Sequence, residues 1–275
     1  MSRFPSDAPS RVVVVAPHST AWTDTHVGKP ITCIPGHAPV ESAAWAELLS
    51  PKASSRTLWV IGSSVMPLWL QPVPEGVRSL TELASVARAH AHQRLGAMNH
   101  ERDWVVQGDW RADRPFVCQA LPRTLFSAMG KAPIVSSPFS LGAARLDARG
   151  VRDGWCAITT PFEAHIVYRR RGRHLHLRSW RLSGQASTPL IEQHLVDEWQ
   201  RERLRTAWPD ETLHWLHLGT THHQTPGQRN LCWADEKLQH AWNQGPQGPE
   251  ADPPPDEASS HLRAAVRLLN MGVQP

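Results

Sequence analysis

An order of predicted elements that occurs twice along the chain constrains the fold more than any other feature of the sequence. The first occurrence has apolar arms at 57–61 and 65–70 on either side of Gly62-Ser63-Ser64, a spacing that predicts a β-hairpin. Pro67 lacks an amide donor, so we expect the second arm to lie at a sheet edge or to bend. A helix follows at 79–95, with Ser79 and Glu82 at capping-box spacing.

The same order returns in the second half of the chain. Apolar runs at 164–169 and 174–182 predict a hairpin that closes at Arg171-Gly172, and a helix follows from 188 to about 208. Ile191, Leu195 and Trp199 are spaced four apart and mark the apolar side of that helix. Alternating strands and helices predict a mixed α/β protein, and the recurrence predicts two lobes of one plan.

The remaining predicted elements complete the two lobes. They are strands at 11–16, with 31–34 as its pairing partner, 103–107, 116–120, 155–160 and 213–218, and short helices at 40–49 and 123–129. The resulting division is an N-terminal tail at 1–10, a first lobe at 11–150, a second lobe at 151–244, a Pro-rich linker at 245–260 and a C-terminal helix at 261–275. Leu262, Val266 and Leu269 lie on one side of this last helix, which either docks on its own domain or binds a partner.

The charge of the chain argues against a nucleic-acid partner. The formal net charge is +4 and the pI is near 9.2, and nucleic-acid binding requires such an excess to gather on one face. Most arginines are scattered, and the exception is the run Arg169, Arg170, Arg171 and Arg173. We interpret this run as a solvated loop or, alternatively, as a contact for an anionic partner or a membrane surface.

Several sequence features predict a cytoplasmic location. No stretch approaches the roughly 20 apolar residues that a bilayer span requires, and the N-terminus has no apolar core of a secretory signal. Cys33, Cys118, Cys156 and Cys232 are widely spaced, which predicts buried thiols in a reducing compartment.

Motifs for catalysis are largely missing from the sequence. Neither a Walker loop nor Gly-x-Gly-x-x-Gly occurs, and Gly62-Ser63-Ser64 lacks the second glycine of a hydrolase elbow, so a plain turn is the better interpretation. His174 and His176 would place two imidazoles on one strand face, a spacing that zinc sites use. A third ligand could come from His214, His217, His222, His223 or Cys232, and histidines on exposed strand faces are the simpler alternative.

Six segments, taken in order, carry a resemblance to a known family. They are TLWVIGSSVMPLWLQPVPEGVRSLTELASVARAHAHQRLG, DWVVQGDW, FVCQALPRTLFSAM, GWCAITTPFEAHIVYRRRGRHLHLRSWRL, LIEQHLVDEWQRERL and LHWLHL. Their arrangement resembles the cytoplasmic actin-like proteins of bacterial type IV pilus and type II secretion machines, such as the pilus assembly protein PilM and the cytoplasmic domain of the type II secretion L protein. The resemblance covers about residues 11–220 and implies a two-lobed, actin-like (ribonuclease H-like) α/β fold.

The resemblance also implies where a nucleotide site would lie. Family members that bind nucleotide carry Asp-x-Gly at a hairpin turn of each lobe, where backbone amides approach the phosphates and the aspartate orients Mg²⁺. Here the second-lobe turn is Thr159-Thr160-Pro161-Phe162-Glu163, which has neither residue, and in the first lobe Ile61-Gly62-Ser63-Ser64 lacks the acid. The alternative first-lobe turn, Ala16-Pro17-His18-Ser19, lacks both. The implied site is therefore vestigial, with Gly62, Ser63, Ser64, Thr159 and Thr160 as its remaining residues and with no cofactor.

The resemblance implies a pseudo-ATPase that serves as a scaffold or adaptor of a bacterial envelope assembly machine. Its partners would be proteins of a membrane-associated assembly, so the chain would be cytoplasmic and peripheral to the inner membrane. Two alternatives remain open at this point: a metal enzyme built on His174 and His176, and a binder of an anionic partner through Arg169 to Arg173.

Overall fold

The computed structural model describes residues 9–16, 19–24, 32–35, 57–95, 104–110, 113–130, 133–183, 188–208, 212–218, 231–233 and 257–270. Most of the predicted tail, the predicted helix at 40–49 and the linker up to residue 256 lie outside the described residues. No helix among those that are described is both long and apolar enough to span a bilayer.

The first lobe is built on a mixed sheet of five strands in the order β3-β2-β1-β4-β8. These strands are β1 (Arg11–Ala16), β2 (Ser19–Asp24), β3 (Thr32–Pro35), β4 (Thr57–Ile61) and β8 (Ile134–Ser136). The first three form an antiparallel meander, whereas β4 and β8 continue the sheet from β1 in parallel. The predicted pairing of 11–16 with 31–34 is wrong, because β2 lies between them. Its polar sequence, STAWTD, has little of the apolar pattern that marks a strand.

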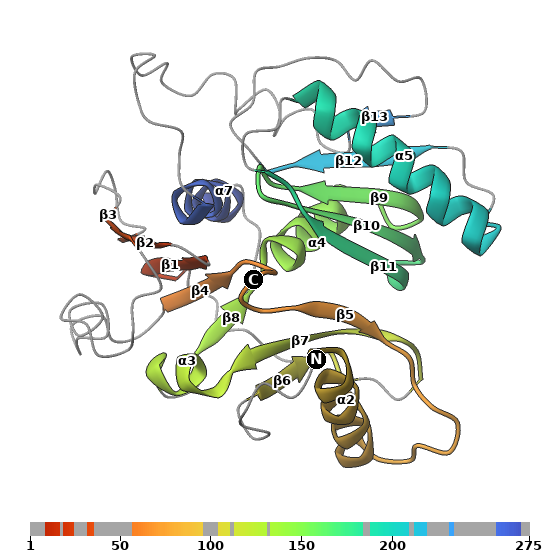
Figure 1. Cartoon of the computed structure of the whole chain (residues 1–275), viewed down its shortest axis with the longest axis horizontal. Coiled ribbons are helices and arrows are strands. Elements are labelled where there is room, and N and C mark those ends of the chain that lie inside the picture. Colours follow the sequence, from red (N-terminus) through yellow and green to blue (C-terminus); the bar gives the residue numbers. More distant parts are fainter. Residues whose placement is uncertain are drawn as a thin grey trace.

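The second lobe repeats this sheet strand for strand. Its order is β11-β10-β9-β12-β13, again with an antiparallel meander followed by two parallel strands. These strands are β9 (Gly154–Thr159), β10 (Glu163–Arg170), β11 (Arg173–Arg181), β12 (Leu213–His217) and β13 (Leu231–Trp233). Two such sheets in one chain, with helices on their faces, are the actin-like (ribonuclease H-like) α/β fold that the sequence predicted (Figure 1).

The predicted hairpin at 57–70 is not formed. β4 is a central strand with β1 on one side and β8 on the other, so it has no free edge for the second arm. The chain turns at Gly62 and enters a separate sheet of three strands, in the order β5-β7-β6. Its strands are β5 (Leu68–Gln71), β6 (Trp104–Gly108) and β7 (Phe116–Pro122). As Pro67 predicted, β5 lies at an edge of its sheet.

Two helices accompany this inserted sheet, and both were predicted. In α2 (Leu80–Leu95), the amide of Glu82 donates to Ser79 Oγ over 3.2 Å, and the Glu82 carboxylate accepts from the amide of Arg78 over 2.8 Å. This capping box fixes the start of the helix. The helix α3 (Arg123–Ala128) follows β7 directly. The insertion belongs to the first lobe only, so the two structural repeats are the five-stranded sheets and not the element order that the sequence indicated.

Helix α5 (Thr188–Thr206) covers one face of the second-lobe sheet. The predicted stripe of Ile191, Leu195 and Trp199 is buried there, against Trp155 and Trp215 of the strands. The opposite face is covered by α4 (Pro138–Ala148), a helix that the sequence analysis missed. Ser137 caps α4 by accepting from the amide of Ser140 over 3.0 Å.

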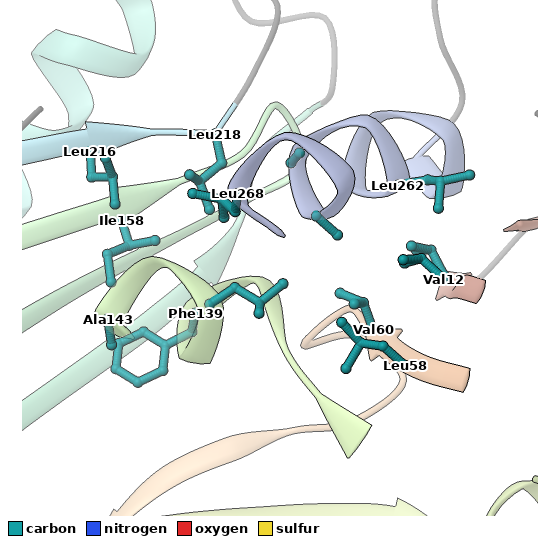
Figure 2. Packing of buried hydrophobic residues seen from close by; sticks show 14 of the residues in the cluster. Val12, Leu58, Val60, Phe139, Ala143, Ile158, Leu216, Leu218, Leu262 and Leu268 are labelled. Carbon is teal, nitrogen blue, oxygen red and sulfur yellow. The ribbon is translucent and has the colours of Figure 1, made fainter. Parts of the chain in front are cut away.

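The C-terminal helix, α7 (Glu257–Asn270), packs between the lobes and not on a partner. Leu262 and Leu268 are fully buried in a core that contains Val12 and Leu58 of the first sheet and Leu216 of the second (Figure 2). Burial of each such leucine stabilises docking by about 1.5–3 kcal/mol.

The side chains that the sequence offered as a partner-binding face therefore belong to the protein's own core. Val266 and Leu269 pack against the same cluster as Leu262. The helix also starts four residues before the end of the predicted linker, because Glu257 forms part of its first turn. A carboxylate in the first turn of a helix interacts favourably with the helix dipole.

Candidate functional site

The turns that follow the central strands of the two sheets meet between the lobes. In the first lobe the amide of Gly62, just after β4, donates to the carbonyl of Val15 over 3.1 Å. The equivalent bond in the second lobe runs from the amide of Leu218, after β12, to the carbonyl of Thr159 over 2.6 Å. The duplicated topology thus brings together Gly62-Ser63-Ser64 and the turn 159–163, the two segments at which a nucleotide was expected.

The second-lobe turn uses its own backbone amides. The hydroxyl of Thr160 accepts from the amides of Phe162 and Glu163, over 3.2 and 3.1 Å. The amide of Thr160 donates back to the carbonyl of Glu163 over 2.8 Å, and Pro161 has no amide hydrogen. None of these groups points outward to receive a phosphate.

Glu163 reaches from the second lobe into the first-lobe turn. One oxygen of its carboxylate accepts from the amide of Ser63 over 2.7 Å and also from the Ser63 hydroxyl. The other oxygen lies 3.3 Å from Nε2 of His165, and both side chains are buried. The Ser63 amide and hydroxyl are the donors that a phosphate loop would offer, and here they bind the protein's own carboxylate.

The electrostatic surroundings keep this carboxylate ionised. Burial alone would raise the pKa of Glu163, but the hydrogen bond and charge of His165, the charge of His261 and the hydrogen bond from Ser63 outweigh it and lower the pKa to about 2. Glu163 therefore carries a full negative charge across the physiological pH range.

The first turns of α7 pack against both interlobe turns. His261 Nε2 lies 2.9 Å from the Thr160 hydroxyl, and burial lowers the pKa of His261 in spite of the opposing charge of Glu163. Glu257 forms an ion pair with Arg181 of the second lobe over 3.1 Å. A Cβ placed on Gly62 would lie 3.4 Å from both Glu257 and His261, so the space above this glycine is filled by α7.

This arrangement opposes the binding of a nucleotide phosphate. A phosphate at Ser63 would have to displace Glu163 from its hydrogen bonds, and it would meet the negative charges of Glu163 and Glu257 at short range. Across the described parts of the chain, no group of three or more His, Cys, Asp or Glu side chains is arranged to hold a metal ion.

The residues predicted for the vestigial nucleotide site do not all lie at the boundary between the lobes. Ser63 and Thr160 contact the Glu163–His261 cluster, and Ser64 Oγ lies 3.5 Å from Glu257. Thr159 takes no part, because its hydroxyl accepts from Nε1 of Trp215 over 2.8 Å and lies 2.7 Å from Nδ1 of His217 in the second-lobe core.

Sequence patterns assign no role to Glu163, His165, Glu257 or His261, although Glu163 ends the turn 159–163. One signal was present for Glu163 and His165, because residues two apart on a strand share a face. A similar signal was present for Glu257 and His261, which are four apart on a helix. No local signal connects these pairs with Ser63.

A groove lies between the inserted sheet, α4 and the start of β11. It has a volume of about 780 Å³ and is lined by β6, β7, β8, α4 and the start of β11. Arg114 and Arg173 are cationic and Asp109 and Asp147 are acidic, whereas the aromatic residues Phe116 and Phe139 of the lining are almost fully buried. The strand β11 lies against β5, and within the described residues each of these strands is at the edge of its sheet.

The two histidines proposed as zinc ligands lie on opposite faces of β11, so that prediction is wrong. The strand pairs Tyr168 with His176 and Arg169 with His174, which leaves Leu175 as an extra residue in a β-bulge. The bulge reverses the alternation of side chains. His174 consequently contacts Phe139 on the α4 side, and His176 lies 2.9 Å from Glu202 of α5.

The arginine run is divided by the same strand geometry. Arg169 is fully buried, where it forms an ion pair with Asp147 and donates to the carbonyl of Val151 over 2.8 Å. Arg170, Arg171 and Arg173 are exposed at the tip of the β10–β11 hairpin. These three side chains are therefore accessible to an anionic partner, and Arg169 is not.

No protein-family model and no curated protein matches the sequence. Among solved structures, the chain is similar to the PilM–PilN type IV pilus biogenesis complex, at 15% identity and a TM-score of 0.49, over 98% of this chain and 100% of that chain. It is also similar to the cytoplasmic domain of EpsL, an inner membrane component of the type II secretion system of Vibrio cholerae, at 11% identity and a TM-score of 0.41, over 96% and 99% of the two chains.

A third similar structure is a protein with an actin-like ATPase fold and unknown function from Bacteroides thetaiotaomicron. The identity is 11% and the TM-score 0.45, over 76% of this chain and 81% of that one. The fold itself is assigned by the strand order of the two sheets, and it is actin-like.

Proposed function

We propose that the protein is a non-catalytic, actin-like adaptor that binds partner proteins on the cytoplasmic side of a bacterial envelope assembly machine of the type IV pilus or type II secretion kind. The observation that carries the non-catalytic part is the buried, ionised carboxylate of Glu163 on the donors of Ser63. The kind of machine is proposed from the resemblance of the sequence.

Nucleotide binding is the first test of this proposal. We expect 1 mM ATP with Mg²⁺ to leave the unfolding free energy unchanged and to give no heat in titration calorimetry. A site with a Kd of about 10 μM would instead raise the unfolding free energy by about 2.7 kcal/mol. Stabilisation of that size, or steady ATP hydrolysis by the purified protein, would overturn the proposal.

The adaptor part of the proposal is supported by the groove between the inserted sheet, α4 and the second lobe. Its volume of about 780 Å³ suits an extended peptide segment, and its lining is largely polar. The edge strands β6 and β11 both contribute residues to the groove, and an edge strand offers unpaired backbone groups to a segment of that kind. We propose that the groove binds a cytoplasmic tail of an inner-membrane component.

Two alanines of α4 give a matched pair of variants for testing the groove. Ala144 lines it, whereas Ala148 is exposed at the end of the same helix. Ala144→Glu should weaken binding of labelled cytoplasmic-tail peptides from pilus or secretion platform proteins of the same genome at least tenfold, because it places a larger, unpaired charged side chain in the space that the peptide would fill. Ala148→Glu should bind like the parent protein. Equal binding by both variants, or no binding of any tail by the parent protein, would refute the groove as the partner site.

A further inference from the structure

The tip of the β10–β11 hairpin concentrates positive charge in a strained arrangement. Arg170 and Arg173 lie directly opposite each other across the two strands, and like charges in such a pair are destabilising. Arg171 and Gly172 form the turn between them, with φ angles of 53° and 72°. Within the described residues, no acidic side chain forms an ion pair with these three arginines.

A neighbouring turn adds more arginines to the same end of the second lobe. The amide of Gly172 donates to the carbonyl of Arg152 over 2.8 Å, and the amide of Arg171 donates to Asp153 over 2.6 Å. These bonds hold the hairpin tip against the segment that follows α4. Arg149 and Arg152 in that segment are exposed. Arg169 of the sequence run is buried and does not contribute to this surface, whereas Arg149 and Arg152, which lie outside the run, do.

A hollow of about 220 Å³ lies at the tip, lined by Arg170, Arg171, Arg173 and Leu175. Guanidinium groups are planar donors that match the oxygens of a phosphate. Leu175 supplies an apolar contact for the carbons attached to such a phosphate. The walls of the hollow are mainly apolar, formed by Leu175 and the carbon chains of the arginines, whereas the exposed arginines as a group give the tip a broad positive surface.

We propose that this basic tip, made of Arg149, Arg152, Arg170, Arg171 and Arg173, binds the phosphate headgroups of an acidic lipid bilayer. A surface with many anions uses the broad array of arginines, whereas a single free phosphate would use only the hollow. Binding of single-stranded nucleic acid commonly adds aromatic side chains on which bases stack, and none of the described residues that line the hollow is aromatic. The tip shares Arg173 with the groove, but its other four arginines are not among the residues that line the groove, so the inference does not require a peptide there.

The test is sedimentation of the full chain with vesicles of phosphatidylcholine, with and without phosphatidylglycerol. The parent protein should bind only the acidic vesicles and should dissociate as salt is added. The variant Arg170→Gln/Arg171→Asn/Arg173→Gln should lose about fivefold in partitioning per arginine, or roughly 100-fold in total. Its fold should be retained, since Asn-Gly is the preferred sequence for a two-residue hairpin turn with positive φ angles. Its urea midpoint should equal or exceed that of the parent, because like charges are removed.

A control of equal charge and an independent second variant sharpen the test. Arg78, Arg88 and Arg94 are exposed on or beside α2, and replacing all three with Gln should leave vesicle binding unchanged. The variant Arg149→Gln/Arg152→Gln lies outside the hairpin and should lose about 25-fold. Equal vesicle binding by the hairpin variant and the α2 control would overturn the proposal. So would failure of the parent to bind acidic vesicles at low salt, tighter binding to labelled oligonucleotides than to vesicles, or binding of inorganic phosphate without vesicle binding.

Discussion

The two lobes have the same strand order, yet they contribute opposite groups to the boundary between them. The first-lobe turn presents an amide and a hydroxyl at Ser63, as a phosphate loop would. The second-lobe turn consumes its own amides at Thr160 and presents the carboxylate of Glu163. The difference shows that two copies of a sheet can keep one topology while their turns diverge. The first-lobe turn still offers donors to an anion, and the second-lobe turn supplies an anionic side chain.

The cores of the lobes differ as well. The second lobe packs Trp199 of α5 against Trp155 and Trp215 of its strands, whereas β1 of the first lobe buries four consecutive valines. A third cluster, which includes Leu58 and Ile158, runs through both sheets with α4 and α7 between them (Figure 2). This shared cluster predicts that the lobes unfold together in spite of their separate sheets.

The largest expected effect tests that cooperativity. Trp199→Ala should destabilise the protein by about 3–5 kcal/mol and Leu58→Ala by about 2–5 kcal/mol, because each leaves a cavity in a fully buried position. Urea unfolding followed by both tryptophan fluorescence and far-UV circular dichroism should give one transition that moves in both variants. Two transitions, of which each variant moves only one, would show that the lobes are independent.

The next largest effect concerns the negative charge of Glu163, which only the second-lobe turn carries. The pKa of Glu163 is lowered from 4.5 to about 2, so its contribution to stability is complete above pH 4.5 and is lost as pH falls through 2. This pKa difference corresponds to about 3 kcal/mol. We expect Glu163→Gln to be less stable than the parent at neutral pH, and the difference to shrink by about that amount on acidification.

Urea unfolding of both proteins across the pH range measures this difference. A constant stability difference between the parent and Glu163→Gln from neutral pH down to pH 2 would contradict an ionised Glu163.

The smallest effect compares two glycines. A Cβ on Gly62 would be in ordinary contact with Glu257 and His261, and its φ is not positive, so Gly62→Ala should change the unfolding free energy by less than about 0.5 kcal/mol. A Cβ on Gly142 would lie 2.5 Å from Ile158, so Gly142→Ala should cost about 1–3 kcal/mol through overpacking. Thermal unfolding distinguishes the two. A large loss of stability in Gly62→Ala would mean that α7 packs too closely against Gly62 to accept a Cβ atom.

Much of the fold could be predicted from local pattern. The apolar run at 11–16, the hairpin turn at Arg171-Gly172 and the capping box of α2 are each specified by neighbouring residues, and each forms as predicted. Short-range signals of this kind reach only a few positions along the chain. They could not show that β4 is a central strand, which rules out the predicted hairpin at 57–70.

The sequence by itself was enough to predict the actin-like fold. It also showed that the turns at 61–64 and 159–163 lack the Asp-x-Gly pattern of nucleotide-binding members. Only the tertiary structure decided that α7 docks in cis, that a bulge separates His174 from His176, and that Glu163 binds Ser63. The last contact joins residues that are 100 positions apart in the chain. Such contacts depend on how two sheets pack, and no periodicity within either segment encodes that packing.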